Sequence, residues 1–165
     1  MADYIKYLRE YVGSQALLLP GAAVILNNTN GEILIQHRID NNMWGLPGGF
    51  MELGESLEEC SRREFYEETG LKLGELQLIN VYSGKDFFYQ YPNGDQVFFV
   101  TAIYYADTYY GNIRLDSPET KDLKFVSISE IFSMGEFDIN DLRVLKLFQK
   151  NVRGKLLDSN IKAFD

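Results

Sequence analysis

The segment from residue 49 to residue 71 limits what this chain can fold into more than any other stretch. It reads GFMELGESLEECSRREFYEETGL and contains seven glutamates but only two arginines, a net charge of −5. The whole chain of 165 residues has a formal net charge of −8, so the remaining residues carry only −3. The negative charge is therefore concentrated in one segment, and it needs a structural or chemical reason.

A helix is predicted over residues 56–68 of this segment. Ser56 is a favourable N-cap residue, and Glu59, three positions later, completes a capping box. Gly70 follows the last helical position, where a glycine ends many helices because it adopts a left-handed backbone conformation without strain. The sequence thus gives this helix both a start signal and a stop signal.

Three carboxylates are expected on one face of the predicted helix, near its C-terminal end. Glu64, Glu67 and Glu68 stand at positions i, i+3 and i+4. Like charges at this spacing destabilise a helix, and the helix dipole disfavours anions at its C-terminal end. Arg62 and Arg63 are expected to point mostly away from Glu64, so a hard divalent cation with oxygen ligands is the better counter-charge. The alternative from the same residues is an ordinary solvated acidic face.

Composition sets the broad class. A hydrophobic fraction of 45% with 24% charged residues is typical of a globular protein, and residues 1–165 are predicted to form a single domain. The acidic balance argues against duplex nucleic acid and anionic membrane as partners, because both attract basic surfaces. Cys60 is the single cysteine and cannot form an internal disulfide. The N-terminus lacks a basic start followed by an apolar run, so a cytoplasmic location is expected.

The rest of the chain is predicted to be an α+β fold. Apolar residues at helical spacing predict a helix over residues 3–12, and a second such pattern predicts a closing helix over 138–150. Residues 40–49 are rich in turn formers and are predicted to be a loop. The turn Pro92–Asp95 indicates a hairpin. Strands are predicted over 22–26, 33–36, 76–82, 87–91, 96–106 and 123–126.

The acidic segment resembles the Nudix box at every position that the box specifies. The matching residues, at the spacing of the box, are Gly49, Glu55, Arg63, Glu64, Glu67, Glu68 and Gly70. The preceding stretch Trp44-Gly45-Leu46-Pro47-Gly48-Gly49 also resembles the usual lead into the box. The resemblance covers roughly residues 15–150. It implies a Nudix-type α/β/α sandwich with a mixed β-sheet, and a single Nudix hydrolase domain.

The resemblance also implies a reaction and a cofactor. Members of this family hydrolyse a nucleoside diphosphate linked to another group, with Mg²⁺ or Mn²⁺ held by glutamates of the box. Carried over to this chain, the oxygen ligands are the carboxylates of Glu64, Glu67 and Glu68, with the carbonyl of Gly49 as a further candidate. The same resemblance implies an ion pair between Glu55 and Arg63 that orients the helix.

Hydrolysis of a pyrophosphate linkage needs a base that can reach the attacking water. Glu67, Glu68 and Glu119 are the candidates, and the sequence does not choose among them. Arg38 resembles a position that often contacts substrate phosphate in the family, although a plain surface arginine is the alternative.

The substrate is left open by the sequence. Asp86 replaces a proline that follows the box in many ADP-ribose hydrolases, and Tyr89 resembles a mark of dinucleoside polyphosphate hydrolases. The remaining small nucleotide substrates are an oxidised nucleoside triphosphate, a dinucleoside polyphosphate, a nucleotide sugar or an RNA 5′ end. Two other readings are a non-catalytic Nudix-fold module that senses a nucleotide and an acidic cation-binding protein. Exposed hairpins in such folds often support dimers, so a homodimer is a further candidate.

Overall fold

The computed structural model describes residues 3–91 and 93–161, with side chains described over 4–91 and 93–150. Pro92 of the predicted turn and the two ends of the predicted 1–165 domain lie outside these residues. The helices are α1 Asp3–Val12, α2 Leu57–Thr69, α3 Ile128–Ser133, α4 Ile139–Ile161 and the short 3₁₀ helix η1 Lys85–Phe87. The strands are β1 Leu17–Leu26, β2 Ile33–Arg38, β3 Trp44–Gly45, β4 Gly48–Phe50, β5 Lys72–Leu73, β6 Gln77–Tyr82, β7 Phe88–Gln90, β8 Gln96–Ala106, β9 Tyr109–Tyr110 and β10 Thr120–Val126.

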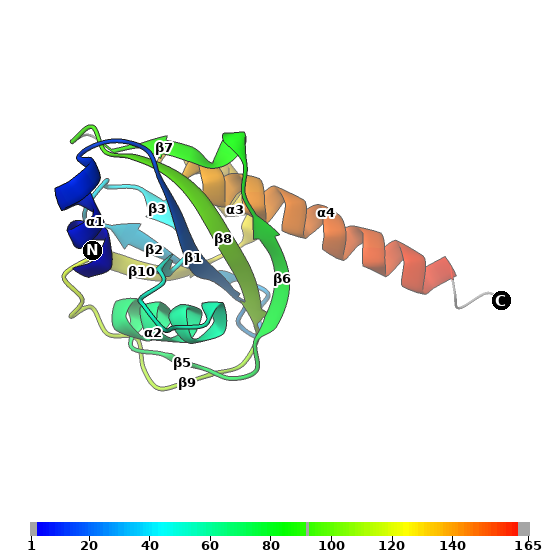
Figure 1. Cartoon of the computed structure of the whole chain (residues 1–165). Coiled ribbons are helices and arrows are strands. Elements are labelled where there is room, and N and C mark those ends of the chain that lie inside the picture. The colour runs from blue at the N-terminus through cyan, green and yellow to red at the C-terminus, as the bar shows by residue number, and fades with distance from the viewer. Residues whose placement is uncertain (1–2, 92, 162–165) are drawn as a thin grey trace.

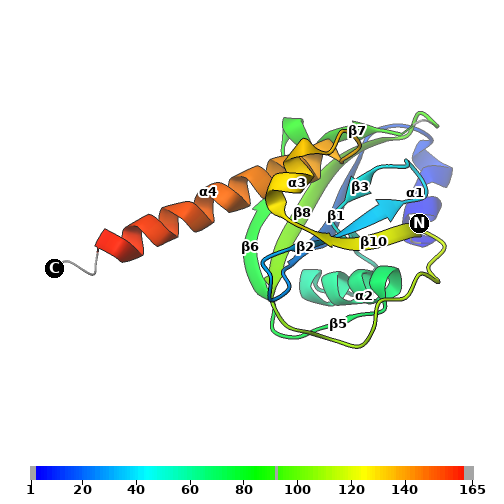
Figure 2. The same ribbon diagram turned by 180° about the vertical axis from the view of Figure 1, so that it is seen from behind.

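Two sheets form the middle of the molecule. The larger has the strand order β4-β1-β8-β6, with β7 paired to β8, and the smaller has the order β10-β2-β3. Strand β1 runs parallel to β8 over its whole length, whereas its pairing with β4 is antiparallel. Helix α2 lies on one side of the sheets and α3 and α4 on the other, and the far end of α4 extends beyond the sheets (Figures 1 and 2). The predicted α+β class with a mixed sheet is confirmed.

The two apolar cores follow from alternation along the strands. Successive side chains of a strand point to opposite faces. On β1, Val24 packs in the core that contains Phe65 of α2, whereas its neighbour Ile25 packs in the core that contains Leu145 of α4. Both faces of β1 are therefore buried, which explains its nearly continuous apolar sequence.

Helix α1 packs against the outside of the larger sheet. Its buried residue Ile5 lies in a small cluster with Leu19 and Val97, and Phe50 and Phe99 pack against that cluster. The helix matches the predicted range 3–12. None of the helices among the described residues is long and apolar enough to cross a membrane.

Three sequence predictions about the elements were wrong. The region 40–49 is not all loop, because it contributes β3 and the start of β4 to the two sheets. Helix α3 was missed, although Ser127 caps it with a hydrogen bond from the Glu130 amide and is a readable signal. Helix α4 continues to residue 161, beyond the predicted end at 150. The first error has a physical reason, since short strands are defined by pairing partners that lie far away in the sequence.

The caps predicted for α2 are present. The Ser56 side chain accepts a hydrogen bond from the Glu59 amide, and the Glu59 carboxylate accepts one from the Ser56 amide. Gly70 ends the helix in the left-handed conformation at φ 76°. These local bonds fix where the carboxylate-bearing helix begins and ends.

We expect Ser56→Ala to lower the free energy of unfolding by about 1 kcal/mol, because the Glu59 amide of α2 loses the hydroxyl oxygen that accepts its hydrogen bond. Urea denaturation measures the change. Ser83→Ala, at an exposed serine outside the helices, is the matched control and is expected to be neutral. Equal stability of both variants would show that the capping box does not hold the start of α2.

Candidate active site

Arg63 joins α2 to the end of β4 and to the loop that follows it. Its Nη2 donates to the Glu55 carboxylate at 2.9 Å and to the Phe50 carbonyl at 2.9 Å. Its Nη1 donates to Glu64 at 2.9 Å and to Glu67 at 3.4 Å. The hydrogen bond from Arg63 lowers the pKa of Glu55, so that carboxyl stays ionised. One guanidinium thus holds the start of the acidic segment and the helix together.

The expectation that Arg63 points away from Glu64 was wrong. A straight helix places residues i and i+1 on different sides, but the long arginine side chain turns back along the helix surface. Arg63 therefore neutralises part of the repulsion between Glu64 and Glu67 without a metal ion. Arg62 does turn elsewhere, to Glu58.

Glu68 is almost completely buried, with 2% of its surface exposed. Its Oε2 accepts a hydrogen bond from the Gly48 amide at 2.7 Å. Its Oε1 is buried without a hydrogen bond from the described residues, and Arg38 Nη1 lies 3.5 Å away. Burial raises the pKa of this carboxyl to about 8, although Arg38 opposes the shift.

The three carboxylates lie on the predicted shared face, but they are not equivalent in exposure. The Glu67 side chain is 58% exposed, that of Glu64 is 15% exposed and that of Glu68 is turned inward. Glu68 turns toward the Gly48 amide of β4, whereas the neighbouring Glu67 faces the open cleft, so adjacent positions on the helix meet very different surroundings. Burial also raises the pKa of Glu64.

Gly49 permits the close approach of α2 to β4. A Cβ atom at this position would overlap the Glu64 carboxylate. The Gly49 carbonyl is contacted by the Cys60 thiol, with 3.7 Å between sulfur and oxygen. All four predicted oxygen ligands, Gly49 and the carboxylates of Glu64, Glu67 and Glu68, line the same open cleft, which has a volume of about 800 Å³.

Arg38 and Glu119 lie on the wall of the cleft opposite α2. Arg38 ends β2, and Glu119 precedes β10, whose chain pairs with β2. The Ile39 amide donates to the Glu119 carbonyl at 3.0 Å, so these two loops are fixed to each other. The structure thus brings all the predicted site residues to one cleft or its immediate wall, with Glu55 behind Arg63.

The donor set of the cleft suits a hard cation. It offers carboxylate oxygens and neither imidazole nor exposed thiolate, which is the preference of Mg²⁺ or Mn²⁺. The buried Glu68 Oε1, without a hydrogen bond among the described residues, is an acceptor that a cation would satisfy. In the described parts of the chain, however, no three His, Cys, Asp or Glu side chains already converge as a metal cluster. Arg63 bonds one oxygen of Glu64 and one of Glu67, which leaves the second oxygen of each carboxylate for a cation.

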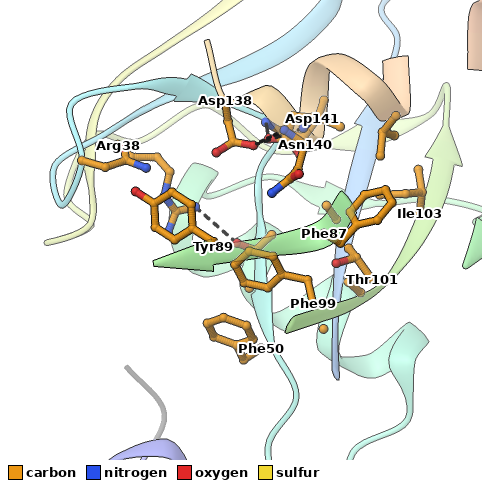
Figure 3. Close-up of a pocket in the computed structure, with 18 of the residues that line it drawn as sticks. Arg38, Phe50, Phe87, Tyr89, Phe99, Thr101, Ile103, Asp138, Asn140 and Asp141 are labelled. Atoms are coloured by element: carbon orange, nitrogen blue, oxygen red, sulfur yellow. Dashed lines mark hydrogen bonds between the residues drawn. The ribbon is translucent and has the colours of Figure 1, made fainter. Parts of the chain in front are cut away.

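A second, smaller cavity of about 150 Å³ adjoins the cleft and is walled by aromatic rings (Figure 3). Both spaces are lined by Arg38, Gly48, Gly49 and Phe50, so they meet at β4. The rings of Phe50 and Phe99 are stacked with centroids 5.8 Å apart. This aromatic pocket has the flat, apolar walls that suit a planar ring.

The polar end of the aromatic pocket is the first turn of α4. Asp138 accepts hydrogen bonds from the amides of Asn140 and Asp141, and so caps the helix. The Asn140 amide group extends toward the aromatic rings (Figure 3). Its oxygen accepts from Arg143 at 3.1 Å, which leaves its NH₂ to donate into the pocket.

Sequence reasoning missed this pocket. Tyr89 was singled out, but Phe99 and Asn140 were assigned only to a strand and a closing helix, and Phe50 was given no role. The pocket is assembled from β4, β7, β8 and α4, which are far apart in the sequence. The one local signal was an Asp138-Ile-Asn140-Asp141 run that is unusually polar for the start of a packing helix.

Taken together, the fold and the cleft define an α/β/α sandwich protein with a carboxylate-lined cleft beside an aromatic pocket. The model of the NUDIX domain family matches residues 17–148. A putative 8-oxo-dGTP diphosphatase of Bacillus subtilis is 37% identical over 109 residues, which cover 65% of this chain and 65% of that protein. An RNA pyrophosphohydrolase of Campylobacter jejuni is 32% identical over 145 residues, covering 78% of this chain and 90% of that protein.

A solved structure supports the fold. The NUDIX domain of Shewanella oneidensis NrtR, crystallised with ADP ribose, superposes with a TM-score of 0.69 at 20% identity, covering 90% of this chain and 97% of that one. The chain belongs to the NUDIX family, and the predicted Nudix-type sandwich is confirmed. The family is generally dependent on divalent metal ions.

The buried Asp141 carboxyl, which lines the aromatic pocket, is predicted to make the stability of the fold depend on pH. It is buried, and burial together with repulsion from Asp138 raises its pKa from 3.8 to about 7, while its Oδ2 accepts from the Leu46 amide. The folded state then binds this proton more tightly than the unfolded state, so the stability contributed by this group falls as the pH rises from about 4 to 7.

Asp141→Asn keeps the acceptor, and its free energy of unfolding is expected to exceed that of the parent protein by roughly 1–3 kcal/mol at pH 8 and by little at pH 4. Urea denaturation across pH measures this, with Asp107→Asn at an exposed acid as control. A gain that does not grow with pH would contradict it.

Proposed function

We propose that this protein is a Mg²⁺-dependent hydrolase, with Mn²⁺ as an alternative ion, that cleaves the pyrophosphate linkage of a nucleoside diphosphate derivative. The derivative is a nucleoside triphosphate, a dinucleoside polyphosphate or a nucleotide sugar. The observation that carries the proposal is the cleft that gathers Glu64, Glu67 and Glu68 beside an aromatic pocket. The names of the relatives, a diphosphatase and a pyrophosphohydrolase, support the same reaction. The unit proposed for this activity is residues 1–165.

In this proposal each part of the cleft has a separate task. Glu64, Glu67 and Glu68 hold the divalent ion, which lowers the pKa of a bound water and neutralises phosphate charge. Arg38, beside the Gly48–Gly49 strand that joins the two cavities, contacts a substrate phosphate. The aromatic pocket takes the base, with the Asn140 NH₂ as a donor to it.

The burial of Glu68 reduces the number of candidates for the general base. Glu68 has one oxygen committed to the Gly48 amide and is closed off from solvent, which suits a ligand better than a base. Glu67 on α2 and Glu119 on the opposite wall are the accessible candidates. We propose that one of these two takes the proton of the attacking water.

We expect Glu68→Gln to lower kcat/KM about 100-fold or more, because the buried carboxylate no longer supplies charge to the ion. The amide oxygen of Gln still accepts from Gly48, so the fold is retained. A panel of nucleoside diphosphate derivatives with Mg²⁺ or Mn²⁺, read by phosphatase-coupled phosphate release, identifies the substrate and measures the loss. Glu58→Gln, at an exposed acid of the same helix, is the control. If the panel yields no cleavage but one nucleotide raises the melting temperature, the sensing-module alternative holds instead.

Mg²⁺ is expected to raise the melting temperature by several degrees, since ligand binding at 100 times Kd adds about 2.7 kcal/mol and each kcal/mol shifts a chain of this size by about 2–4 °C. Differential scanning calorimetry with and without EDTA measures the shift. Glu68→Gln should remove most of it, while Glu58→Gln should keep it. Turnover that continues undiminished in excess EDTA would overturn the metal mechanism.

A further inference from the structure

Arg114 stands at the end of α2 and was not singled out by the sequence. Its backbone amide donates to the carbonyl of Thr69 at 2.9 Å, so the loop after β9 is bound to the last turn of the helix. Gly70 makes room for its side chain, because a Cβ there would lie 2.7 Å from Arg114 Nε. Arg114 is therefore positioned one helical turn beyond Glu67.

The guanidinium of Arg114 lies over an aromatic ring and makes few polar contacts among the described residues. Its central carbon lies 5.2 Å from the ring centroid of Tyr66 on α2, a cation–π contact. The nearest carboxylate is Asp116, with 3.8 Å between Nε and Oδ1. Among the described residues no side-chain hydrogen bond is formed by Arg114, so the N–H edge of its guanidinium is left available. Such an edge matches the oxygens of a phosphate bidentately.

The other arginines of the cleft differ in this respect. Arg63 donates to Glu55, Glu64 and the Phe50 carbonyl, and Arg38 is paired with Glu68 and Asp40. Seven carboxylates and three arginines line the cleft. Arg114 is the arginine of this lining whose charge is least compensated at short range by the described residues.

The place of Arg114 along the cleft indicates which phosphate it meets. The aromatic pocket opens into the cleft at Gly48, Gly49 and Arg38. Arg114 lines the cleft but not the aromatic pocket, and it lies beyond the carboxylates of α2. A nucleotide with its base in the pocket would cross the carboxylates first and reach Arg114 with the far end of its phosphate chain.

We propose that Arg114, oriented by Tyr66, binds a phosphate of the substrate on the far side of the carboxylates from the base, and so favours substrates with three or more linked phosphates. This preference for longer phosphate chains rests on the proposed function and specifies its substrate class. A nucleotide sugar, whose diphosphate ends in an uncharged ring, would gain little from this arginine. Arg114 is thus a residue that sets specificity by phosphate-chain length.

A structural role for the same residue is a distinct alternative. A cation at a helix C-terminus stabilises the helix through its dipole, and Arg114 is bonded to the last turn of α2. That role would change the melting temperature but not the discrimination between substrates. The two roles can therefore be separated by measuring both quantities on the same variants.

The test compares four variants of the full chain. Arg114→Ala removes the charge, Arg114→Lys keeps it without the planar fork, and Tyr66→Leu removes the stacking surface. Lys72→Ala is the matched control, because Lys72 lies 5.9 Å from the same Tyr66 ring but does not line the cleft. Each variant is titrated with inorganic tripolyphosphate and with orthophosphate in the presence of Mg²⁺, by calorimetry. KM and kcat are measured for a nucleoside triphosphate and for a nucleotide sugar.

We expect Arg114→Ala to weaken tripolyphosphate binding about 10- to 100-fold and to raise KM for the triphosphate similarly, with kcat nearly unchanged. Arg114→Lys and Tyr66→Leu should fall in between, and Lys72→Ala should match the parent protein. Nucleotide-sugar kinetics should change little in any variant.

Unchanged tripolyphosphate binding in Arg114→Ala, with only a lower melting temperature, would overturn the proposal in favour of helix capping. Orthophosphate binding as strong as tripolyphosphate binding would also overturn it, since the site would then hold a free anion. If no nucleotide is hydrolysed by the parent protein, the proposed function fails, but the tripolyphosphate titration still decides the role of Arg114.

Discussion

The attachment of α2 to the β4 loop is the constraint on which the site depends. A single guanidinium, that of Arg63, bonds the Phe50 carbonyl, the Glu55 carboxylate and the Glu64 carboxylate. A second attachment runs from the Gly48 amide to the buried Glu68 carboxylate. Because both attachments use the glutamates themselves, the helix cannot move from the loop without rearranging the carboxylates. The positions of these groups are thereby set by the same bonds that hold the fold together.

This arrangement explains how the fold tolerates the cluster of glutamates in the acidic segment. Part of the repulsion among the glutamates is relieved internally by Arg63 and Arg38, and part is relieved by the raised pKa of Glu68. A cation that enters the cleft competes with those two arginines and with a proton. The site is therefore a balance of charges in which two arginines and the raised pKa of Glu68 offset the repulsion among the glutamates.

The sequence predicted much of this structure because its strongest signals are local. Ser56, Glu59 and Gly70 act within one or two turns, so the bounds of α2 follow from them directly. The apolar runs of β1 and β8 predicted strands for the same reason. The short strands β3 and β4 were missed because only their pairing with distant strands makes them strands. Arg63 was misjudged because spacing along a helix gives the direction of Cβ and not the reach of a long side chain.

By itself the sequence determined the family, the helix that carries the glutamates and the three carboxylates that come to the cleft, since these are encoded in the spacing of one short segment, whereas Arg38 and Glu119 were found by resemblance outside it. The tertiary structure alone decided how those residues differ. Three residues of the same type differ in exposure: the carboxyl of Glu67 is exposed, that of Glu64 is half-buried and that of Glu68 is buried. The surroundings of each carboxyl, rather than the residue type, set the free-energy cost of its charge. The aromatic pocket and the stacked Arg114 likewise exist only in three dimensions, because each joins elements that are distant along the chain.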